Sequence, residues 1–575
     1  MAAPLPASIS YSHALALHGT PKYPPDWQAA TTVNAEAPQG GEWREAIIGS
    51  FDTLNRYQVK GTPAAGLHLL QDTLLARSWD EPFSLYALVA EGVALDNDRQ
   101  WLAFKLNKAA RFHDGSPITT KDVLFTFNLL REKGKPFTRE SYKAVQEVKI
   151  ISPQEIVFFF NNKAERETPM LLGMMPIFPE HYWQGHDFSA TGFEAPLSSG
   201  PYKVAQVEAG KRIIYEKVND YWAKDLPVNR GFYNVERVIY EYFRDESVAF
   251  EAFKAGTLNV RRENDWGRSA ASYQDNLPDG MHMEDIPHQR PEAMRGFIFN
   301  LRRPLFQDMR VRRAFSVMFD AGWVAENFFH GLVKPINSFY PNSVLAASTP
   351  LSPQAEAILS PILGQLPEDV QENMQAGGCF WQPQPARQRL KLADNLLAQA
   401  GFVVKDGERQ KNGEKLNFEI LLSDHKDEKI ALYYAEQLAK LGIDVRVRTA
   451  DSTSFQGRVD RFDYDMVLHR WISTLSPGVE QRGYFGSNAR DSKGSRNYAG
   501  LASKGVDLLI DGLTRQTSRE GLEANAQALD KTLGGFCLAI PLFYRGVDRM
   551  AWWDSIKRPA ITPLYGVVTE SWWNN

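Results

Sequence analysis

Strand-like and helix-like patterns of hydrophobic residues alternate in two parts of the chain. In the first, residues 237–243 read as a strand, and residues 246–254 carry apolar side chains at helical spacing. Gly256 is typical of a helix end, and a second strand-like segment follows at 258–261. We predict a β-α-β unit, the arrangement that normally builds a parallel sheet.

The second part is longer and ends in a segment of aromatic and basic residues. Residues 416–422, 443–448 and 464–468 are strand-like. Residues 429–441 place alanine and leucine on one helical face, and a short helix is expected around 452–459. This β-α-β-α-β order predicts half of a doubly wound sheet.

The ends of these strands are the candidate ligand-binding positions. In open α/β sheets, ligands bind beyond the carboxyl ends of the strands. The rule selects residues 261–264 after the first unit, and residues 469–471 with the loop to Tyr484 after the second. Trp266 and Trp471 lie near these ends, and each is either packed in a core or placed to contact a flexible ligand. We expect the site in a cleft between domains.

Length and charge limit the classes of protein to which the chain can belong. With 575 residues it is too long for one ordinary domain, so we expect two or three lobes. No low-complexity tract separates them, which indicates lobes that share strands. A net charge of −4 argues against a nucleic-acid partner, which would need a basic face. No apolar stretch approaches the ~18 residues that cross a bilayer.

A search for catalytic and metal-binding motifs finds none that is specific. The sequence has no HExxH, CxxC, P-loop, GxGxxG or GxSxG pattern. Residues 423–426 match SxxK, but no KTG or SDN accompanies them, so we interpret them as a turn between a strand and a helix. His181 and His186 lack a third ligand nearby in sequence. We therefore predict no catalytic residue, no metal and no cofactor.

The two cysteines and the N-terminus leave the cellular compartment open. Cys379 and Cys537 are the only cysteines, and such low usage fits both the cytosol and an oxidising periplasm. The N-terminus has no basic and apolar signal regions. It is either the natural start of a cytosolic protein or a mature end with an added Met, the signal peptide being absent.

Four blocks of sequence, in order along the chain, carry a resemblance to a known family. They are residues 111–123 (RFHDGSPITTKDV), 199–204 followed by Asn219–Trp222, 299–320 with Phe299-Asn300 and Asp308–Ala314, and 393–401. Together they are similar to family 5 of the periplasmic solute-binding proteins, which serve peptide- and nickel-type ABC importers. Further stretches, including 49–57 and 549–554, resemble its peptide-binding members.

The resemblance implies an α/β fold of the two-lobed periplasmic binding protein type (type II, cluster C) with a third lobe. Lobe I would comprise residues 1–55, 180–262 and 495–575, lobe II residues 56–179, and lobe III residues 263–494. The ligand cleft would lie between lobes I and III and close by a hinge motion. Residues 111–123 would be scaffold, with Gly115 in a turn and Thr119 or Thr120 capping a helix.

The same division leads to a prediction about the cysteines. Cys379 would lie in lobe III and Cys537 in lobe I. Because a bridge between moving lobes would restrict closure, we expect two free thiols.

One departure from the family bears on the ligand. Many peptide binders of the family carry an Asp shortly after the tryptophan that corresponds to Trp471, where it pairs with the peptide's amino terminus. Here no acidic residue appears until Glu480. Basic residues are instead frequent around the expected cleft: Arg261, Arg262, His469, Arg470, Arg482, Arg490 and Arg496. They either form ion pairs within the protein or hold an anionic ligand, such as a murein-derived peptide.

The expected function is capture of short peptides in the periplasm for the membrane permease subunits of an ABC importer, by a monomer. Alternatives are binding of a peptide–nucleotide antibiotic or an opine-like sugar phosphate, or hydrolysis of acidic peptides. The expected ligand-binding residues are Arg261, Arg262, Asn264, Trp266, His469, Arg470, Trp471, Ser473, Thr474, Asn55 and Tyr498. Arg261 and Arg470 would hold negative charge, and Trp471 would form an apolar wall.

Overall fold

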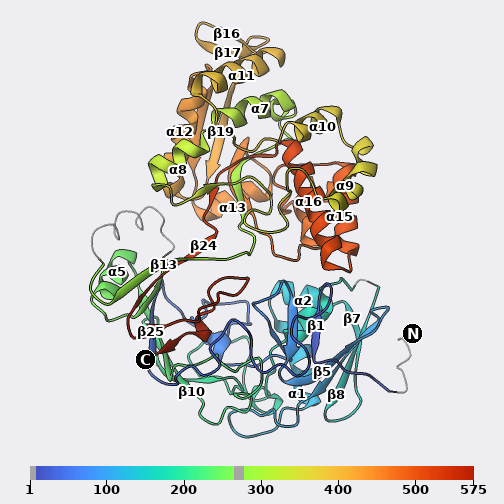
Figure 1. Cartoon of the computed structure of the whole chain (residues 1–575), viewed down its shortest axis with the longest axis vertical. Helices are drawn as coiled ribbons and strands as arrows, with labels where there is room; N and C mark the ends of the chain where they lie inside the picture. The colour runs from blue at the N-terminus through green and yellow to red at the C-terminus, as the bar shows by residue number, and fades with distance from the viewer. Residues whose placement is uncertain (1–7, 163, 264–276) are drawn as a thin grey trace. The chain divides into compact units, whose positions relative to one another are not determined.

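The computed structural model describes residues 8–162, 164–263 and 277–575. The chain forms two compact units (Figure 1). Of the described residues, unit 1 comprises 8–162, 164–263, 277–288 and 547–575, and unit 2 comprises 289–546. Among the described helices, none is long and apolar enough to span a membrane.

A seven-stranded sheet forms the centre of one part of unit 1. Its order is β13-β24-β12-β2-β11-β10-β9. The bounds are Met281–Pro287 (β13), Val547–Trp553 (β24), Val260–Arg262 (β12), Glu42–Ile48 (β2), Arg237–Phe243 (β11), Arg212–Lys217 (β10) and Tyr202–Glu208 (β9). Strands β11 and β12 both pair in parallel with β2, and helix α5 (Glu246–Lys254) connects them. The predicted β-α-β unit is confirmed.

The rest of unit 1 is built on a four-stranded antiparallel sheet. Its order is β5-β6-β8-β7, with bounds Ala90–Leu95, Trp101–Leu106, Glu155–Phe160 and Val145–Ile150. Helix α1 (Thr120–Lys133) packs Val123, Phe127 and Leu130 into the same core as the apolar face of this sheet. The short helix α2 (Pro136–Tyr142) contacts α1 and a second short helix, α3 (Thr168–Gly173).

The turn and the helix cap predicted for segment 111–123 are confirmed. Gly115 has φ +84°, a left-handed conformation that favours glycine, and Thr119 and Asp122 form a capping box at the start of α1. His113 Nε2 lies 2.8 Å from the carbonyl oxygen of Gly200, which joins this block to the second one. The capping box and the link to Gly200 fix the turn and the start of the helix.

Unit 2 contains a five-stranded sheet between two layers of helices. Its order is β20-β19-β21-β14-β22, with bounds Asp444–Thr449, Asn417–Leu422, Met466–Trp471, Met294–Phe299 and Ala539–Pro541. Strand β19 pairs in parallel with β20 and β21. Helices α12 (Glu428–Ala439) and α13 (Ser452–Asp460) complete the predicted β-α-β-α-β order, which is confirmed.

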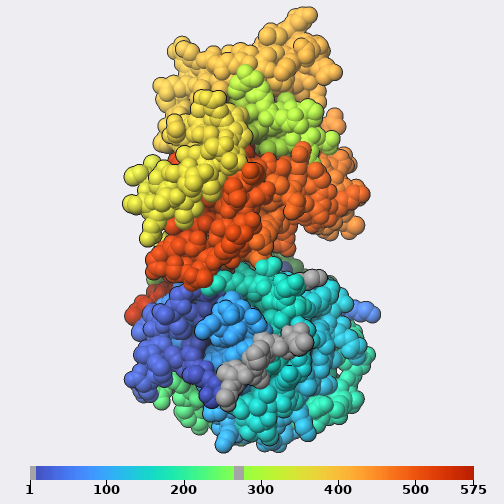
Figure 2. Space-filling view, turned by 90° about the vertical axis from the view of Figure 1, so that its right-hand side faces the viewer, coloured from blue at the N-terminus to red at the C-terminus, as the bar shows by residue number. Residues whose placement is uncertain are grey.

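Each face of this sheet has its own hydrophobic core. Phe297, Ile420 and Leu468 pack toward helices α7 (Met309–Met318), α11 (Ala386–Gln399) and α12. Ile298, Leu421 and Val467 pack toward α9 (Pro353–Leu359), α10 (Glu368–Gln375), α15 (Lys504–Arg515) and α16 (Arg519–Phe536). Figure 2 shows the orange-red α15–α16 pair beside the yellow α9–α10 segment. The alternation of side chains along each strand produces these two layers.

The grouping of the C-terminal residues differs from the expected lobes. Helices α15 and α16 and strand β22 pack within unit 2, so residues 495–546 lie with unit 2 and only 547–575 return to unit 1. The expected boundary at residue 495 comes from the resemblance. In the structure, β22 pairs with β14 and thereby fixes this segment in the second sheet.

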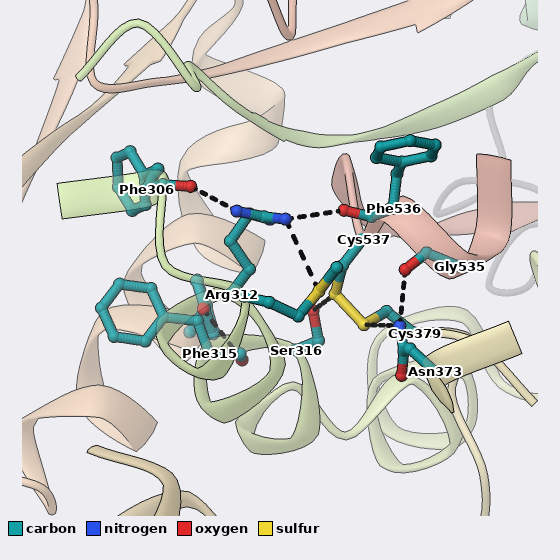
Figure 3. The surroundings of a disulfide bond; sticks show 11 residues. Phe306, Arg312, Phe315, Ser316, Asn373, Cys379, Gly535, Phe536 and Cys537 are labelled. Atoms are coloured by element: carbon teal, nitrogen blue, oxygen red, sulfur yellow. Dashed lines mark hydrogen bonds between the residues drawn. A yellow bond between two sulfur atoms is a disulfide. The ribbon is translucent and has the colours of Figure 1, made fainter. Parts of the chain in front are cut away.

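Cys379 and Cys537 form a disulfide, so the prediction of two free thiols is wrong (Figure 3). Both cysteines lie in unit 2, and their Cα atoms are 5.2 Å apart. Cys537 belongs to this unit because it directly follows α16. Two further side chains bind the end of α16: Arg312 donates to the carbonyl oxygen of Phe536 (3.1 Å), and Asn373 donates to that of Gly535 (2.8 Å). The disulfide therefore ties α16 to the segment after α10.

Candidate functional site

Strand β21 ends in the predicted cluster of His469, Arg470 and Trp471. The strand runs three residues further than the sequence pattern indicates and includes all three. It lies between β19 and β14 in the middle of the unit 2 sheet.

The three side chains do not share one surface, because successive residues of a strand point to opposite faces. His469 and Trp471 lie on the face that carries Tyr498, with ring centroids 4.1 and 6.0 Å from the Tyr498 ring. Arg470 lies on the other face. Trp471, the expected apolar wall, and Arg470, the expected cation, therefore lie on opposite faces of the sheet.

Trp471 is a core residue of unit 2. Only 3% of its surface is exposed, and its indole N–H donates to the carbonyl oxygen of Arg496 at 3.0 Å. Its ring packs between Phe339 and Phe485, with centroid distances of 5.8 and 5.1 Å. The indole thus supports the strand end and has little surface left for a ligand.

His469 is held in its neutral form. Burial is the main cause that lowers its pKa to about 4, and the positive charges of Arg470 and Arg496 lower it further. Its imidazole stacks on the ring of Tyr498 at an interplanar angle of 19°. At neutral pH this side chain can offer hydrogen bonds to a ligand but no charge.

The Arg470 guanidinium is exposed on its face of the sheet. In the described part of the chain, no carboxylate lies within ion-pair distance of it. Its cross-strand neighbour on β14 is Arg295, which is already paired with Asp427 at 2.6 Å. Arg470 is therefore available to an anion from outside the protein.

The loop after β21 exposes polar and apolar side chains. Ile472 and Thr474 are exposed, and Ser473 is half-buried. The Thr474 hydroxyl accepts a hydrogen bond from the backbone N–H of Ser476 at 3.2 Å. Glu480, the first acidic residue after Trp471, accepts from the backbone N–H of Gly478 at 3.0 and 3.1 Å. Its carboxylate thus shapes the loop.

In unit 1, the arginines at the end of β12 form ion pairs within the protein. Arg261, with 6% of its surface exposed, binds Glu246 and the fully buried carboxylate of Glu263. Arg262 binds Asp548 at 3.1 Å. The structure therefore assigns Arg261 first to stabilising the strand end, which differs from the expected role of holding a ligand's charge.

The remaining expected residues divide into two groups. Asn55 is engaged in local structure: its side-chain N–H donates to the carbonyl oxygen of Phe188 at 2.9 Å, and its side-chain oxygen accepts from the N–H of Tyr57. It also lines a cavity of about 140 Å³ in unit 1. Asn264 and Trp266 lie outside the described residues.

Three other arginines near the loop have partners within unit 2. Arg482 pairs with Asp511 at 3.3 Å, and Arg490 lies 3.7 Å from Asp491. Arg496 donates to the hydroxyl of Tyr484 at 3.3 Å. Of the basic residues singled out in the sequence, Arg470 has the clearest capacity to bind an external anion.

Metal-binding geometry is not found in the described residues, which contain no group of three His, Cys, Asp or Glu side chains placed to hold an ion.

The sequence reasoning did miss one feature, a cavity of unit 1 lined by Arg56, Lys135 and Tyr142. These residues come from two segments about 80 positions apart. Each is unremarkable in its own sequence context, and no sequence signal marks them as neighbours.

Comparisons with known proteins agree with this architecture. The family model of bacterial extracellular solute-binding proteins, family 5, matches residues 74–493. Peptidoglycan-binding protein YepA of Agrobacterium fabrum is 35% identical, over 99% of this chain and 96% of its own length. Probable peptide-binding protein YejA of the same organism is 34% identical, over 97% of this chain and 93% of its own length.

A solved structure confirms the predicted fold class. The periplasmic murein tripeptide binding protein MppA, in its unliganded open form, superimposes with a TM-score of 0.64 at 15% identity, covering 94% of this chain and 98% of its own. The matched family residues and the near full-length relatives lead to one conclusion. The chain belongs to family 5 of the bacterial extracellular solute-binding proteins, among the relatives of YejA and YepA.

Proposed function

We propose that this protein captures short peptides in the periplasm and delivers them, as a monomer, to the permease subunits of an ABC importer. The observation that carries the proposal is the similarity, over nearly the whole chain, to relatives named as peptide-binding and peptidoglycan-binding proteins. The ligand is bound and released unchanged. Peptides with extra carboxylates, such as those derived from murein, are the preferred class.

Arg470 supports the preference for anionic peptides. Its guanidinium is exposed at the end of a parallel strand, where α/β sheets place their ligands, and has no carboxylate partner in the described residues. A planar guanidinium binds a carboxylate through two parallel hydrogen bonds. No acidic side chain stands between Trp471 and Glu480 to pair with a ligand's amino group.

Calorimetry of the unmodified protein and of Arg470→Gln tests the proposal with an acidic murein tripeptide. A charge-assisted hydrogen bond contributes about 1.5–3 kcal/mol, so the variant should bind about ten- to a hundred-fold more weakly. Arg446→Gln is the matched control, because Arg446 is an exposed arginine of β20 in the same sheet, away from the strand end. Equal affinity in all three proteins would rule out the role of Arg470, and absence of any peptide binding would rule out the function.

A further inference from the structure

A cavity of about 280 Å³ opens in unit 1 beside the short helices α2 and α3. Its apolar lining comes from the ends of α1 and α2, from α3 and from the segment after it: Leu130, Phe137, Leu171, Met174 and Pro176. Its polar lining comprises Arg56, Tyr57, Lys135, Thr138, Ser141 and Tyr142. The space is large enough for an organic molecule of several carbon atoms.

The charge of this lining has one sign. Arg56 and Lys135 are both exposed, and within the described chain neither forms an ion pair. No Asp or Glu is among the described residues that line the cavity. Two cations that converge on one cavity without a carboxylate leave a net positive charge for a ligand to neutralise.

The second observation is a tyrosine hydroxyl without a partner among the described residues, in the lining of the cavity. Tyr142 is only 4% exposed, and its ring stacks on Phe127 with a centroid distance of 5.2 Å. In the described residues, neither its hydroxyl nor that of Tyr57 has a hydrogen-bond partner. Both hydroxyls lie in the lining of the same cavity and can donate to an oxyanion there.

We propose that this cavity is a binding site for a carboxylate carried on an apolar chain. Arg56 and Lys135 neutralise the carboxylate, the hydroxyls of Tyr57 and Tyr142 donate to its oxygens, and Leu171 and Met174 contact the apolar chain. The carboxyl end of a short peptide with an apolar last residue has this chemistry. The site belongs to unit 1 alone, and it does not rest on the proposed function, because its test uses N-acetyl-leucine and its amide as the probes.

Calorimetry of the full chain with N-acetyl-leucine and with its amide tests the site. N-acetyl-leucine should bind, and the amide, which lacks the carboxylate, should bind about ten-fold or more weakly. Arg56→Gln and Lys135→Gln should each weaken the binding of N-acetyl-leucine by about ten- to a hundred-fold. Tyr142→Phe should weaken it by about five- to ten-fold. Lys133→Gln is the matched control: it removes an exposed cation two residues from Lys135 that does not line the cavity.

The outcomes separate this site from the proposed function. Thermal unfolding of each variant within about 2 °C of the unmodified protein shows that the fold is kept. Equal binding of the acid and the amide, or of the unmodified protein and the three variants, would overturn the site even if peptides still bind at Arg470. If the three variants bind N-acetyl-leucine more weakly and the unmodified protein binds no peptide, the site is upheld and the proposed function is overturned.

Discussion

Asp530 is a buried carboxylate of α16, and its protonation links the stability of unit 2 to pH. It accepts hydrogen bonds from the hydroxyl of Ser338 (2.8 Å) and from the backbone N–H groups of Phe339 (2.6 Å) and Ala347 (2.7 Å). Burial, the largest cause, raises its pKa from 3.8 to about 6. Because the folded pKa exceeds the unfolded one, the stabilisation is complete below about pH 4 and is lost as the pH rises through about 6.

Substitution Asp530→Asn should therefore cost most at low pH. The amide loses one acceptor and destabilises the protein, but it cannot lose stability by ionising. The difference in free energy of unfolding from the unmodified protein should shrink by up to about 3 kcal/mol between pH 4 and pH 7. Urea denaturation at both pH values measures it, with Asp444→Asn on the exposed edge strand β20 as the control. A difference in unfolding free energy that grows toward pH 7 would contradict the raised pKa of Asp530.

Arg261 illustrates how a residue expected to bind ligand is used for structure. Arg261→Ala removes a guanidinium that pairs with the fully buried carboxylate of Glu263, so we expect a loss of about 3–5 kcal/mol in unfolding free energy. Arg44→Ala, which removes a half-exposed ion pair with Glu42 on β2, should cost less than about 1 kcal/mol. If both variants unfold at the same denaturant concentration, the pairing of Arg261 contributes nothing to stability.

Helices and strands could be predicted where the hydrophobic pattern of neighbouring residues determines them. The strand and helix periods of residues 237–261 and 416–468 depend on neighbouring positions, and both units of alternating strands and helices are found. The extra length of β21 was missed, because pairing with β14 continues through His469, Arg470 and Trp471. The burial of Trp471 could not be predicted, since it depends on Phe339 and on the helix that follows the loop.

The disulfide is the feature that sequence reasoning placed wrongly. The error came from an assignment of residues 495–575 to one lobe, whereas packing of α16 and β22 places Cys537 in unit 2. Nothing in the sequence near either cysteine indicates that the two meet across 158 positions.

Removing the disulfide should destabilise unit 2. It restricts the unfolded chain by closing a loop of 158 residues, and bridges of this kind typically contribute 2–5 kcal/mol. The double substitution Cys379→Ser and Cys537→Ser should lower the midpoint of thermal unfolding, as should treatment with a reductant. Thiol titration of the denatured, non-reduced protein should find no free group, and two free groups would contradict the pairing.

At the scale of the whole molecule, family membership and fold class were the most secure predictions, because they rest on ordered blocks spread over the chain. The blocks act as scaffold: Asn300, for example, donates to the carbonyl oxygens of Phe462 and Tyr464 and links β14 to the start of β21. The ligand site was less predictable. The strand-end rule selected the last residues of β21, and their role in ligand binding stays a prediction. Strand alternation and local ion pairs decide which side chains there remain available.

Native mass spectrometry of the full chain, after incubation with a pool of short peptides, shows whether the protein binds peptides and leaves them intact. We expect one intact peptide per chain, with acidic peptides enriched over neutral ones and less peptide retained by Arg470→Gln. A chain that retains no peptide, or a pool converted to smaller fragments, would contradict the proposal that this protein binds peptides without changing them.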